Sequence, residues 1–474
     1  MYKKVDEQVV KRLEDIVGGS IVRDLDLMEP YAHDEYALRD IWRSPEVVVR
    51  PTSDGQVVEI LKLAYKERIP VTARGSGTGL CGGCVPIYGG IVLSLENMNR
   101  VLEIDAKNRI ALVEPGVTLM QFASEAEGTG LFFSPRPGDE SASFGGVIAT
   151  NAGGSRALRY GVTRGCTMGL DVALPPPYEG IVALGGKTAK DSSGYSLLHL
   201  MVGSEGTLGI VTKETVRLDP LPMATSTLIV PYENLHDAIE TVPAILRGGL
   251  RPTALEFVQQ DVVTVAEKKR DMKSHFYGGQ AYLMIEIDAA TEEESDQAAE
   301  VLAGICEEHG CVDILLATKQ QQEEVWDFRG KLYEAIKEYV IEILDIVVPP
   351  WEIARHVDAV QKISEKYGVW IPTYGHAGDG NVHSHLMRVR FEEGTLEEIE
   401  EAAWRASYAQ IRDEIHEDAK ARGGLVSGEH GIGLTKKKYL PLFCDALRIG
   451  LMRGIKKEFD PSHILNPGKI FDME

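Results

Sequence analysis

The spacing of hydrophobic residues changes along the chain and predicts helices and strands in turn. Val5, Val9 and Leu13 recur every four residues, which predicts an amphipathic helix packed on the body of the protein. Ser53 is a typical N-cap residue and predicts a second helix. Short apolar runs between glycine-rich turns then predict strands at 71–73, 91–95, 101–104 and 110–113. Residues 50–217 are therefore expected to form an α+β region with many turns.

The middle of the chain repeats one order of elements, which is strand, helix and strand. The first copy runs from Ser226 to Phe257 and the second from Ala281 to Ala317. Two such copies predict one antiparallel sheet with helices on one face. Beyond them, helical patterns alternate with strands, and a glycine- and histidine-rich loop precedes a last helix that ends near Phe459. We therefore predict an α+β fold in three parts, which are residues 1–220, 221–421 and 422–474.

Length and charge narrow the classes of function. At about 150 residues per domain, 474 residues predict two or three domains. The formal charge of −22 excludes the electrostatic footprint of a protein that binds nucleic acid or an anionic membrane. The chain lacks both an apolar run of about 18 residues and the apolar core of a signal peptide. We expect a cytoplasmic protein without an intrinsic membrane span.

The six cysteines do not resemble a disulfide scaffold and suit a reducing compartment. Cys81 and Cys84 have the spacing of a redox motif, whereas a zinc site would need a second such pair. We interpret this pair as part of the packing of a loop, with redox chemistry as the alternative.

Glycines concentrate between Gly75 and Gly209. The segment from Gly77 to Gly82 matches G-x-G-x-x-G after a predicted strand, but Pro86 argues against the helix that a Rossmann site requires there. Consecutive backbone N–H groups in such a turn can still form a nest for a phosphate. Tight turns in a β-rich domain would explain any one of these segments. Several such glycine-rich segments together favour a bound dinucleotide that lies close to the backbone at several points.

Two histidines flank a predicted hairpin turn. Asp379-Gly380 between extended segments predicts a two-residue turn, which would place His376 directly opposite His383. Their Cβ atoms would then lie about 4.5–5.5 Å apart, so both rings could bind one divalent metal. The alternative is a hydrogen-bonded or stacked surface pair. His385 lies on the same face, where it is expected to be a partner of Tyr374.

The segment Ser427-Gly-Glu-His-Gly-Ile-Gly433 offers a further carboxylate and imidazole, Glu429 and His430. The flanking glycines predict a loop, in which the two side chains need not point in opposite directions. The alternative is an acid that caps a helix. If the substrate is an anion, a bound divalent cation would supply positive charge at the site, which the acidic protein as a whole lacks.

Four segments resemble the FAD-binding domain of the vanillyl-alcohol oxidase, or PCMH, type. They are Arg74-Gly-Ser-Gly-Thr-Gly-Leu80, Ser143-Phe-Gly-Gly-Val-Ile-Ala-Thr-Asn-Ala-Gly-Gly154, Arg159-Tyr-Gly-Val-Thr163 and Gly203-Ser-Glu-Gly-Thr-Leu-Gly-Ile-Val211. The match is to the branch that holds the glycolate oxidase FAD subunit, D-lactate dehydrogenase and D-2-hydroxyglutarate dehydrogenase. It departs from that branch in having fewer consecutive glycines at 75–77 and a cysteine at position 81.

The resemblance covers nearly the whole chain and implies a two-subdomain FAD-binding domain, a ferredoxin-like antiparallel cap and a C-terminal helical segment. FAD would be non-covalent and lie between the subdomains, with the 74–79 loop on the pyrophosphate. The residues implied near the cofactor are Arg74, Gly75, Ser76, Gly77, Thr78, Gly79, Pro137, Gly138, Ser143, Gly145, Gly146, Gly153, Glu205, Gly206, Ile210 and Asn466. Asn466 could instead belong to a turn after the last helix.

The resemblance also implies the roles of the polar residues. His376, His383 and Glu429 would bind a divalent metal (Zn, Fe or Mn), and His430 would be the base. Arg329 would bind the substrate carboxylate with a bidentate geometry. The alternative for Arg329 is a surface salt bridge.

Substrate and partners follow from the same resemblance. Relatives that act on dicarboxylates carry a second cationic residue where this chain has Ile343. The expected substrate is therefore a small monocarboxylate, D-lactate ahead of glycolate. The absence of an Fe–S ligand cluster implies a separate electron acceptor, either an electron-transfer flavoprotein or an Fe–S subunit. An FAD oxidase that uses oxygen and a non-catalytic electron-relay subunit are the alternatives.

Overall fold

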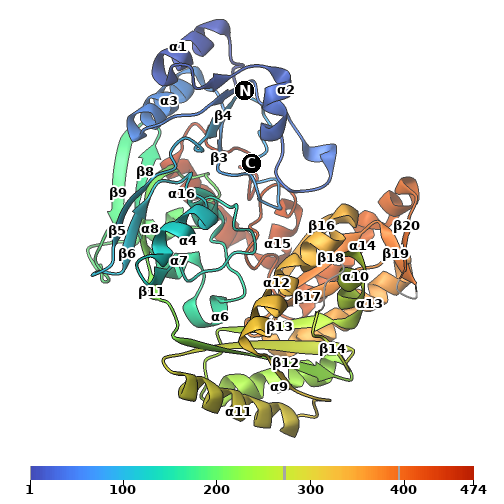
Figure 1. Ribbon diagram of the computed structural model, residues 1–474. Coiled ribbons are helices and arrows are strands. Elements are labelled where there is room, and N and C mark those ends of the chain that lie inside the picture. Colours follow the sequence, from blue (N-terminus) through green and yellow to red (C-terminus); the bar gives the residue numbers. More distant parts are fainter. Residues whose placement is uncertain (1, 271–273, 393–394, 474) are drawn as a thin grey trace. The chain divides into compact units, whose positions relative to one another are not determined.

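The computed structural model describes residues 2–270, 274–392 and 395–473. The chain divides into two compact units, which are described separately below (Figure 1). The first unit comprises Met1–Gly153, Gly161–Leu221 and Glu429–Glu474, and the second comprises Gly154–Tyr160 and Pro222–Gly428. The first unit is therefore assembled from the two ends of the chain.

The first unit contains a small sheet with three parallel strands. The strand order is β1-β2-β4-β3, formed by β1 (Ile21–Val22), β2 (Val47–Val49), β4 (Ile91–Ser94) and β3 (Val71–Arg74). Two predicted helices, α1 (Glu7–Val17) and α3 (Asp54–Glu67), pack on it, and Ser53 caps α3 as expected. This packing buries Leu13 of α1 and Leu61 of α3 completely.

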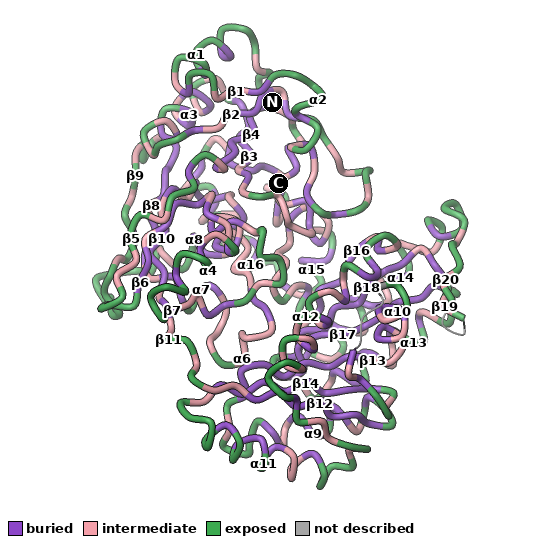
Figure 2. Tube along the Cα trace, in the orientation of Figure 1, coloured by how far each residue is buried: buried purple, intermediate pink, exposed green. Residues whose placement is uncertain are grey.

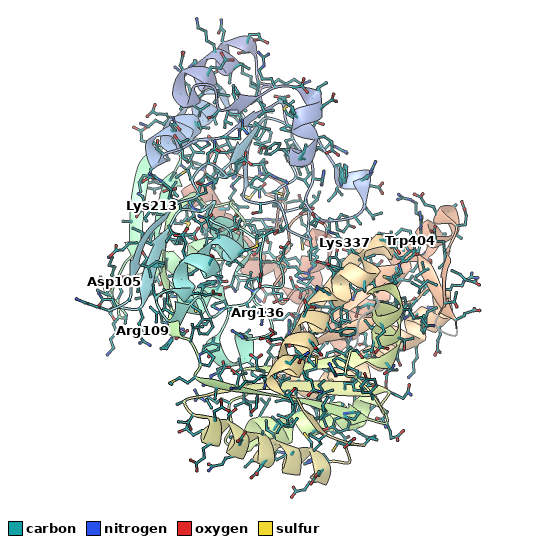
Figure 3. The ribbon with its side chains drawn as sticks, in the orientation of Figure 1. Asp105, Arg109, Arg136, Lys213, Lys337 and Trp404 are labelled. Atoms are coloured by element: carbon teal, nitrogen blue, oxygen red, sulfur yellow. The ribbon has the colours of Figure 1, made fainter. Side chains whose placement is uncertain are left out.

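A second sheet of the first unit is antiparallel, with the order β5-β6-β10-β8-β9. Its strands are β5 (Val101–Asp105), β6 (Ile110–Val113), β8 (Thr167–Leu174), β9 (Gly180–Gly185) and β10 (Ile210–Arg217). Lys213 of β10 pairs with Asp171 of β8 and with Asp54 at the start of α3, so it connects the helix to this sheet (Figure 3). The pair β7 (Leu131–Phe132) and β11 (Asp219–Pro220) is also antiparallel.

The other helices of the first unit are short, except the last. They are α2 (Leu25–Met28), α4 (Leu119–Glu127), α5 (Phe144–Thr150), α7 (Thr163–Cys166), α8 (Leu197–Met201), α15 (Leu440–Phe443) and α16 (Ala446–Phe459). After α16 the chain returns to the first sheet, where Leu465 bridges Val71 of β3 in parallel and Asn466 N donates to Val71 O at 2.7 Å.

The turn after α16 is fixed by a buried ion pair. Lys456 Nζ contacts Asp460 Oδ2 at 2.5 Å and also donates to the carbonyls of Thr207 and Leu465. Asp460 in turn accepts the amides of Ile464 and Leu465. Both charged side chains are almost inaccessible to solvent, so each charge is compensated by the other charge instead of by water.

The second unit is built on one antiparallel sheet with the order β15-β12-β14-β13-β17-β18-β16. Its strands are β12 (Ala224–Tyr232), β13 (Ala254–Gln259), β14 (Ala281–Ala289), β15 (Leu315–Leu316), β16 (Val340–Val347), β17 (Thr373–His376) and β18 (Asn381–Met387), and β19 (Val389–Glu392) forms a separate pair with β20 (Thr395–Glu398). Its helices are α6 (Ala157–Tyr160), α9 (Leu235–Arg247), α10 (Gln260–Arg270), α11 (Glu292–Glu308), α12 (Lys319–Ile336), α13 (Ile353–Tyr367) and α14 (Glu401–Ala421).

Helices cover both faces of this sheet, whereas the sequence predicted one covered face. Helices α9 and α11 share a face as expected, and Ser226 of β12 bonds Ser295 of α11 there at 2.6 Å. Thr227 points to the other face, where it accepts a hydrogen bond from Trp326 of α12. The central strands β12, β13 and β14 are consequently buried (Figure 2).

Helix α14 carries the largest fully buried side chain, Trp404, whose Nε1 donates to the carbonyl of Met387 at 3.1 Å (Figure 3). Among the residues described, no helix combines the length and apolar character needed to cross a membrane.

Candidate active site

The glycine loop after β3 packs against the start of α5. A Cβ on Gly75 would lie 2.0 Å from Ser143 Oγ, and that same hydroxyl accepts the amide of Ser76 at 3.2 Å. Gly77 has a φ of +82°, and a Cβ there would lie 2.0 Å from Arg74 Nη2. The positive φ favours glycine at position 77, and a side chain at position 75 would force Ser143 to move. No helix forms between β3 and β4, which confirms that this is not a Rossmann loop.

Arg74, at the end of β3, is held in place by polar contacts. Its Nη1 donates to the carbonyl of His33 at 2.5 Å and to Cys84 Sγ at 3.1 Å. Burial raises the pKa of the Cys84 thiol more than the Arg74 charge lowers it, so this cysteine favours the neutral form. Cys81 contacts the carbonyls of His430 and Gly431, both at 3.3 Å. Neither cysteine forms a disulfide with another described residue.

A second cluster of predicted cofactor residues joins the C-terminal segment to the loop at 203–209. Glu205 is buried with a φ of 52°, and its carboxylate accepts the amides of Ile432 and Gly433 at 2.8 and 2.7 Å. Burial raises the pKa of Glu205, and those two hydrogen bonds oppose the shift. Asn466 Nδ2 donates to the carbonyls of Glu205 and Gly83, each at 2.8 Å. Glu205 thus holds the segment that follows His430.

The remaining predicted cofactor residues differ in their surroundings. Gly145 packs on Pro115, Gly146 lies beside Ser143, and Gly79 lies beside Asp34. A Cβ on Gly153 would lie 2.6 Å from Glu429 Oε2, which places this glycine beside a predicted metal ligand. Ile210 is the first residue of β10, and Gly206 lies four residues before it. Thr78 lies in the glycine loop, and Pro137 and Gly138 lie on a loop in which Gly138 is exposed.

In the second unit, β17 and β18 form the predicted histidine hairpin with a different register. His376 pairs with Asn381 and His383 pairs with Tyr374, so the prediction that the two histidines lie directly opposite was wrong. The turn spans the four residues 377–380 rather than two, which moves the register by two positions. A shift of two keeps every side chain on its face. The two rings are consequently diagonal neighbours, with centroids 5.3 Å apart.

His385 has the partner that the sequence predicted. Its ring stacks on Tyr374 with centroids 4.6 Å apart, and its Nδ1 lies 3.2 Å from the carbonyl of Pro372.

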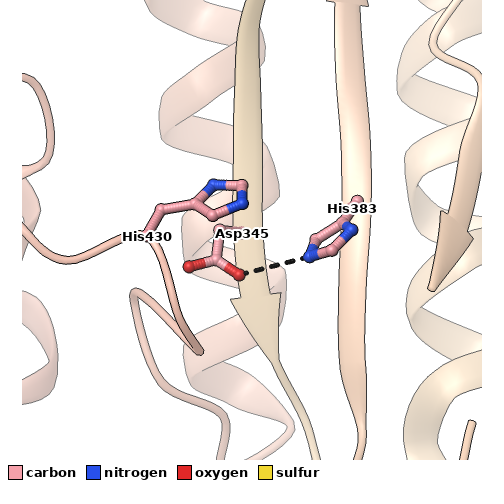
Figure 4. A group of neighbouring side chains, drawn as sticks. All are labelled: Asp345, His383 and His430. Atoms are coloured by element: carbon pink, nitrogen blue, oxygen red, sulfur yellow. Dashed lines mark ion pairs between the residues drawn. The ribbon is translucent and has the colours of Figure 1, made fainter. Parts of the chain in front are cut away.

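Two buried acids lie on the same face as the histidines, and sequence reasoning missed both. Asp345 of β16 is opposite His383, with Oδ1 3.5 Å from His383 Nε2 (Figure 4). Asp345 also accepts Asn381 Nδ2 at 2.8 Å, Ser427 Oγ at 2.6 Å and Gly428 N at 2.9 Å. The signal in the sequence was an acid within a mostly apolar strand. Such a strand is expected to be buried, and an Asp or Glu is rarely buried unless it has a polar partner.

Glu256 of β13 is the second of these acids. It is fully buried opposite His376, whose Nδ1 lies 2.5 Å from its Oε1. Its other oxygen, Oε2, accepts Arg329 Nη2 at 2.6 Å. Burial raises the pKa of Glu256, but the favourable interactions with His376 and Arg329 outweigh burial and leave the pKa below its usual value.

Arg329 of α12 is a largely enclosed partner of an acid rather than a surface one. Its side chain is 14% exposed and its guanidinium lies over the ring of Tyr374 at 4.8 Å. Arg329 Nε is buried and has no hydrogen-bond partner within the described part of the chain. A buried donor of this kind is costly, and an anion would satisfy it.

The predicted polar residues are thus divided between the units. His376, His383 and Arg329 belong to the second unit, whereas Glu429 and His430 begin the last segment of the first. Gly428, which Asp345 holds, is the residue immediately before Glu429.

Comparisons with known proteins decide the family. A family model described as "FAD binding domain" matches residues 45–176, and one described as "FAD linked oxidases, C-terminal domain" matches residues 221–470. The chain belongs to the FAD-linked oxidase family. The predicted FAD cofactor is confirmed by this membership, as is the class of FAD-linked oxidoreductase.

Among the relatives of this FAD-linked oxidase family member are two D-lactate dehydrogenases and a glycolate oxidase subunit. The chain is 44% identical to a D-lactate dehydrogenase of Archaeoglobus fulgidus over 90% of this chain and 91% of the relative. Identity is 39% to a D-lactate dehydrogenase of Anaerostipes hadrus, over 99% and 98% of the two chains. It is 37% to the glycolate oxidase subunit GlcD of Bacillus subtilis, over 99% and 97%.

A solved structure of p-cresol methylhydroxylase with substrate bound superposes with a TM-score of 0.80 and covers 100% of this chain and 99% of that one. At 18% identity this likeness shows the fold alone. It confirms the predicted PCMH-type α+β fold.

Proposed function

We propose that this protein is an FAD-dependent dehydrogenase that oxidises a D-2-hydroxy acid, D-lactate ahead of glycolate, to the 2-oxo acid. The observation that carries the proposal is the polar face of the second unit's sheet, where two histidines and an arginine lie beside buried carboxylates in a family member related to D-lactate dehydrogenases. A structural role alone would not require so many buried polar groups on one face.

Arg329 would bind the substrate carboxylate. Glu256 occupies one amino group of the guanidinium and leaves the buried Nε available. A carboxylate at that edge would satisfy the donor and gain a charge-assisted hydrogen bond. Ile343, on the same face and opposite His385, offers no second cation, which favours a monocarboxylate.

His376, His383 and Glu429 would hold a divalent metal, which fits this donor set because imidazole and carboxylate suit Zn, Fe and Mn. The diagonal placement of the rings on one buried face supports this. Asp345 accepts a hydrogen bond from the amide of Gly428. Glu429 is the next residue, so its Cα lies about 3.8 Å from the Cα of Gly428. The metal, when bound, supplies a Lewis acid for the substrate hydroxyl and carboxylate oxygens.

The first unit would bind FAD through the residues that the sequence implied, Arg74–Gly79, Pro137, Gly138, Ser143, Gly145, Gly146, Gly153, Glu205, Gly206, Ile210 and Asn466. The glycines at 75 and 77, where no side chain fits, support such a cradle. FAD, when bound, accepts the substrate Cα hydrogen as a hydride.

His430 would take the proton of the substrate hydroxyl. Its backbone carbonyl is contacted by Cys81, and the residues that follow it are held by Glu205. A neutral imidazole fixed in this way can accept a proton near neutral pH. The electrons would leave through a partner protein, either an electron-transfer flavoprotein or an Fe–S subunit.

The test is anaerobic bleaching of the flavin band at about 450 nm. The FAD-loaded protein is mixed with D-lactate, L-lactate, glycolate or D-2-hydroxyglutarate, before and after treatment with a chelator. We expect bleaching by D-lactate, loss of bleaching after chelation and recovery on adding the metal back. A His430→Asn variant should retain FAD without being reduced. Bleaching that persists at the parental rate in this variant would exclude His430 as the base.

A further inference from the structure

Glu256 occupies a position where a charge needs strong compensation. It lies on β13 between β14 and β17, and its side chain is fully buried. Burying a carboxylate is unfavourable unless polar partners replace the water that it loses. Both oxygens of Glu256 have partners, and the two partners come from different elements.

The two contacts fix two side chains that the proposed reaction uses. Oε1 faces His376 Nδ1, and an ionised carboxylate can only accept, so Nδ1 carries the ring proton and Nε2 carries the lone pair. Oε2 holds Arg329 Nη2, which leaves the buried Nε edge of the guanidinium for an anion. One rigid carboxylate thus determines the tautomer of His376 and the orientation of Arg329.

We infer that Glu256 is a positioning residue that serves the metal ligand His376 and the substrate-binding Arg329 at the same time. This inference rests on the proposed function. Carboxylates behind a ligating histidine raise metal affinity about 10- to 100-fold by fixing the ring. Here the same carboxylate would also prepare the binding of the substrate, so metal affinity and KM would both depend on it.

Two variants separate these effects. In Glu256→Gln the amide oxygen can still accept from Arg329, but the amide N–H₂ would face His376 Nδ1 and favour the tautomer with Nε2 protonated. We expect metal affinity to fall about 10- to 100-fold and KM for D-lactate to change less than about threefold. Glu256→Ala removes both contacts, so metal affinity should fall and KM should rise at least about tenfold.

Metal affinity is measured directly, by competition for Zn²⁺ between the FAD-loaded protein and a chelating dye, and KM by anaerobic flavin reduction. The matched control is Asp261→Asn. Asp261 is an acid of α10 that accepts from Trp370 and contacts neither His376 nor Arg329 in the part of the chain that the structure describes. Circular dichroism and FAD content establish that each variant folds.

The outcomes are distinct. Loss of metal affinity in Glu256→Gln, with loss of both properties in Glu256→Ala, supports the inference. Metal affinity within twofold of the parent in Glu256→Gln overturns it, as does a Glu256→Ala variant that loses only one property. A parent protein that neither binds Zn²⁺ nor is reduced by any hydroxy acid contradicts the proposed function itself.

Discussion

Asp345 should hold the 427–428 turn to the sheet, and replacing it with Asn tests this. Its two oxygens accept from Asn381, Ser427 and Gly428. Asn has the same shape but only one acceptor, so it either sets its amide N–H₂ against that of Asn381 or loses both bonds to the turn. A hydrogen bond to a charged group contributes about 1.5–3 kcal/mol. Removing the charge also removes its desolvation cost, so we expect a net loss of about 2 kcal/mol in the local stability of the turn.

The measurement is amide hydrogen exchange of Gly428, whose N–H donates to the carboxylate of Asp345 at 2.9 Å and to its backbone carbonyl at 3.0 Å. The backbone bond remains in Asp345→Asn, so exchange reports the opening of the whole turn, which breaks both bonds. At 1.4 kcal/mol per tenfold, a loss of about 2 kcal/mol accelerates exchange roughly 30-fold. Substrate-driven flavin reduction should slow at least about tenfold, because Glu429 and His430 follow this turn. Ser427→Ala is the matched control, since it removes one neutral donor and should accelerate exchange less than about threefold. Gly428 exchange within twofold of the parent in a folded Asp345→Asn protein would refute the reasoning.

Three further predictions concern the first unit. Gly77→Ala should lower FAD affinity at least about tenfold in a fluorescence titration, because its Cβ would displace Arg74, whereas Gly128→Ala, where nothing lies within 4 Å, should not. Burial lowers the pKa of Lys469 to about 8, so the unfolded chain keeps this proton to higher pH and stability rises between pH 8 and about 10.5. The free energy of unfolding of the parent relative to Lys469→Met should increase by about 2 kcal/mol from pH 8 to 10, and an unchanged difference contradicts the assignment. Lys456→Met should destabilise the first unit by about 3–5 kcal/mol in urea, because Asp460 then remains buried without its counter-ion. Asp460→Asn in the same chain removes that charge and keeps an acceptor for the amides of Ile464 and Leu465, so it should restore part of the loss, and a double variant no more stable than Lys456→Met contradicts the reasoning.

The sequence predicted what depends on local pattern. The helix after Ser53, the glycine loop without a following helix and the face shared by His376 and His383 all follow from spacing and capping. The predicted register of the hairpin was wrong because Asp379-Gly380 is only half of a four-residue turn. The two histidines still share a face because the predicted and observed registers differ by two residues, an even number.

What could not be predicted depends on pairing between strands that are distant in sequence. Glu256 meets His376 only because β13 lies beside β17, and Asp345 meets His383 only because β16 lies beside β18. Glu256 and His376 are 120 positions apart in the sequence, and no local pattern predicts that they become neighbours. The placement of α12 over the histidine face likewise comes from packing, which a strand–helix–strand pattern does not determine.

The division of the chain has a consequence for how the protein is synthesised. Almost all of the second unit is contiguous, from Pro222 to Gly428, so it can fold on the ribosome as soon as it has emerged. The FAD-binding unit must wait, because Leu465 and Asn466 complete its first sheet beside Val71. We therefore expect the second unit to fold before the first, whose N-terminal part cannot complete its first sheet until residues 465–466 have been synthesised.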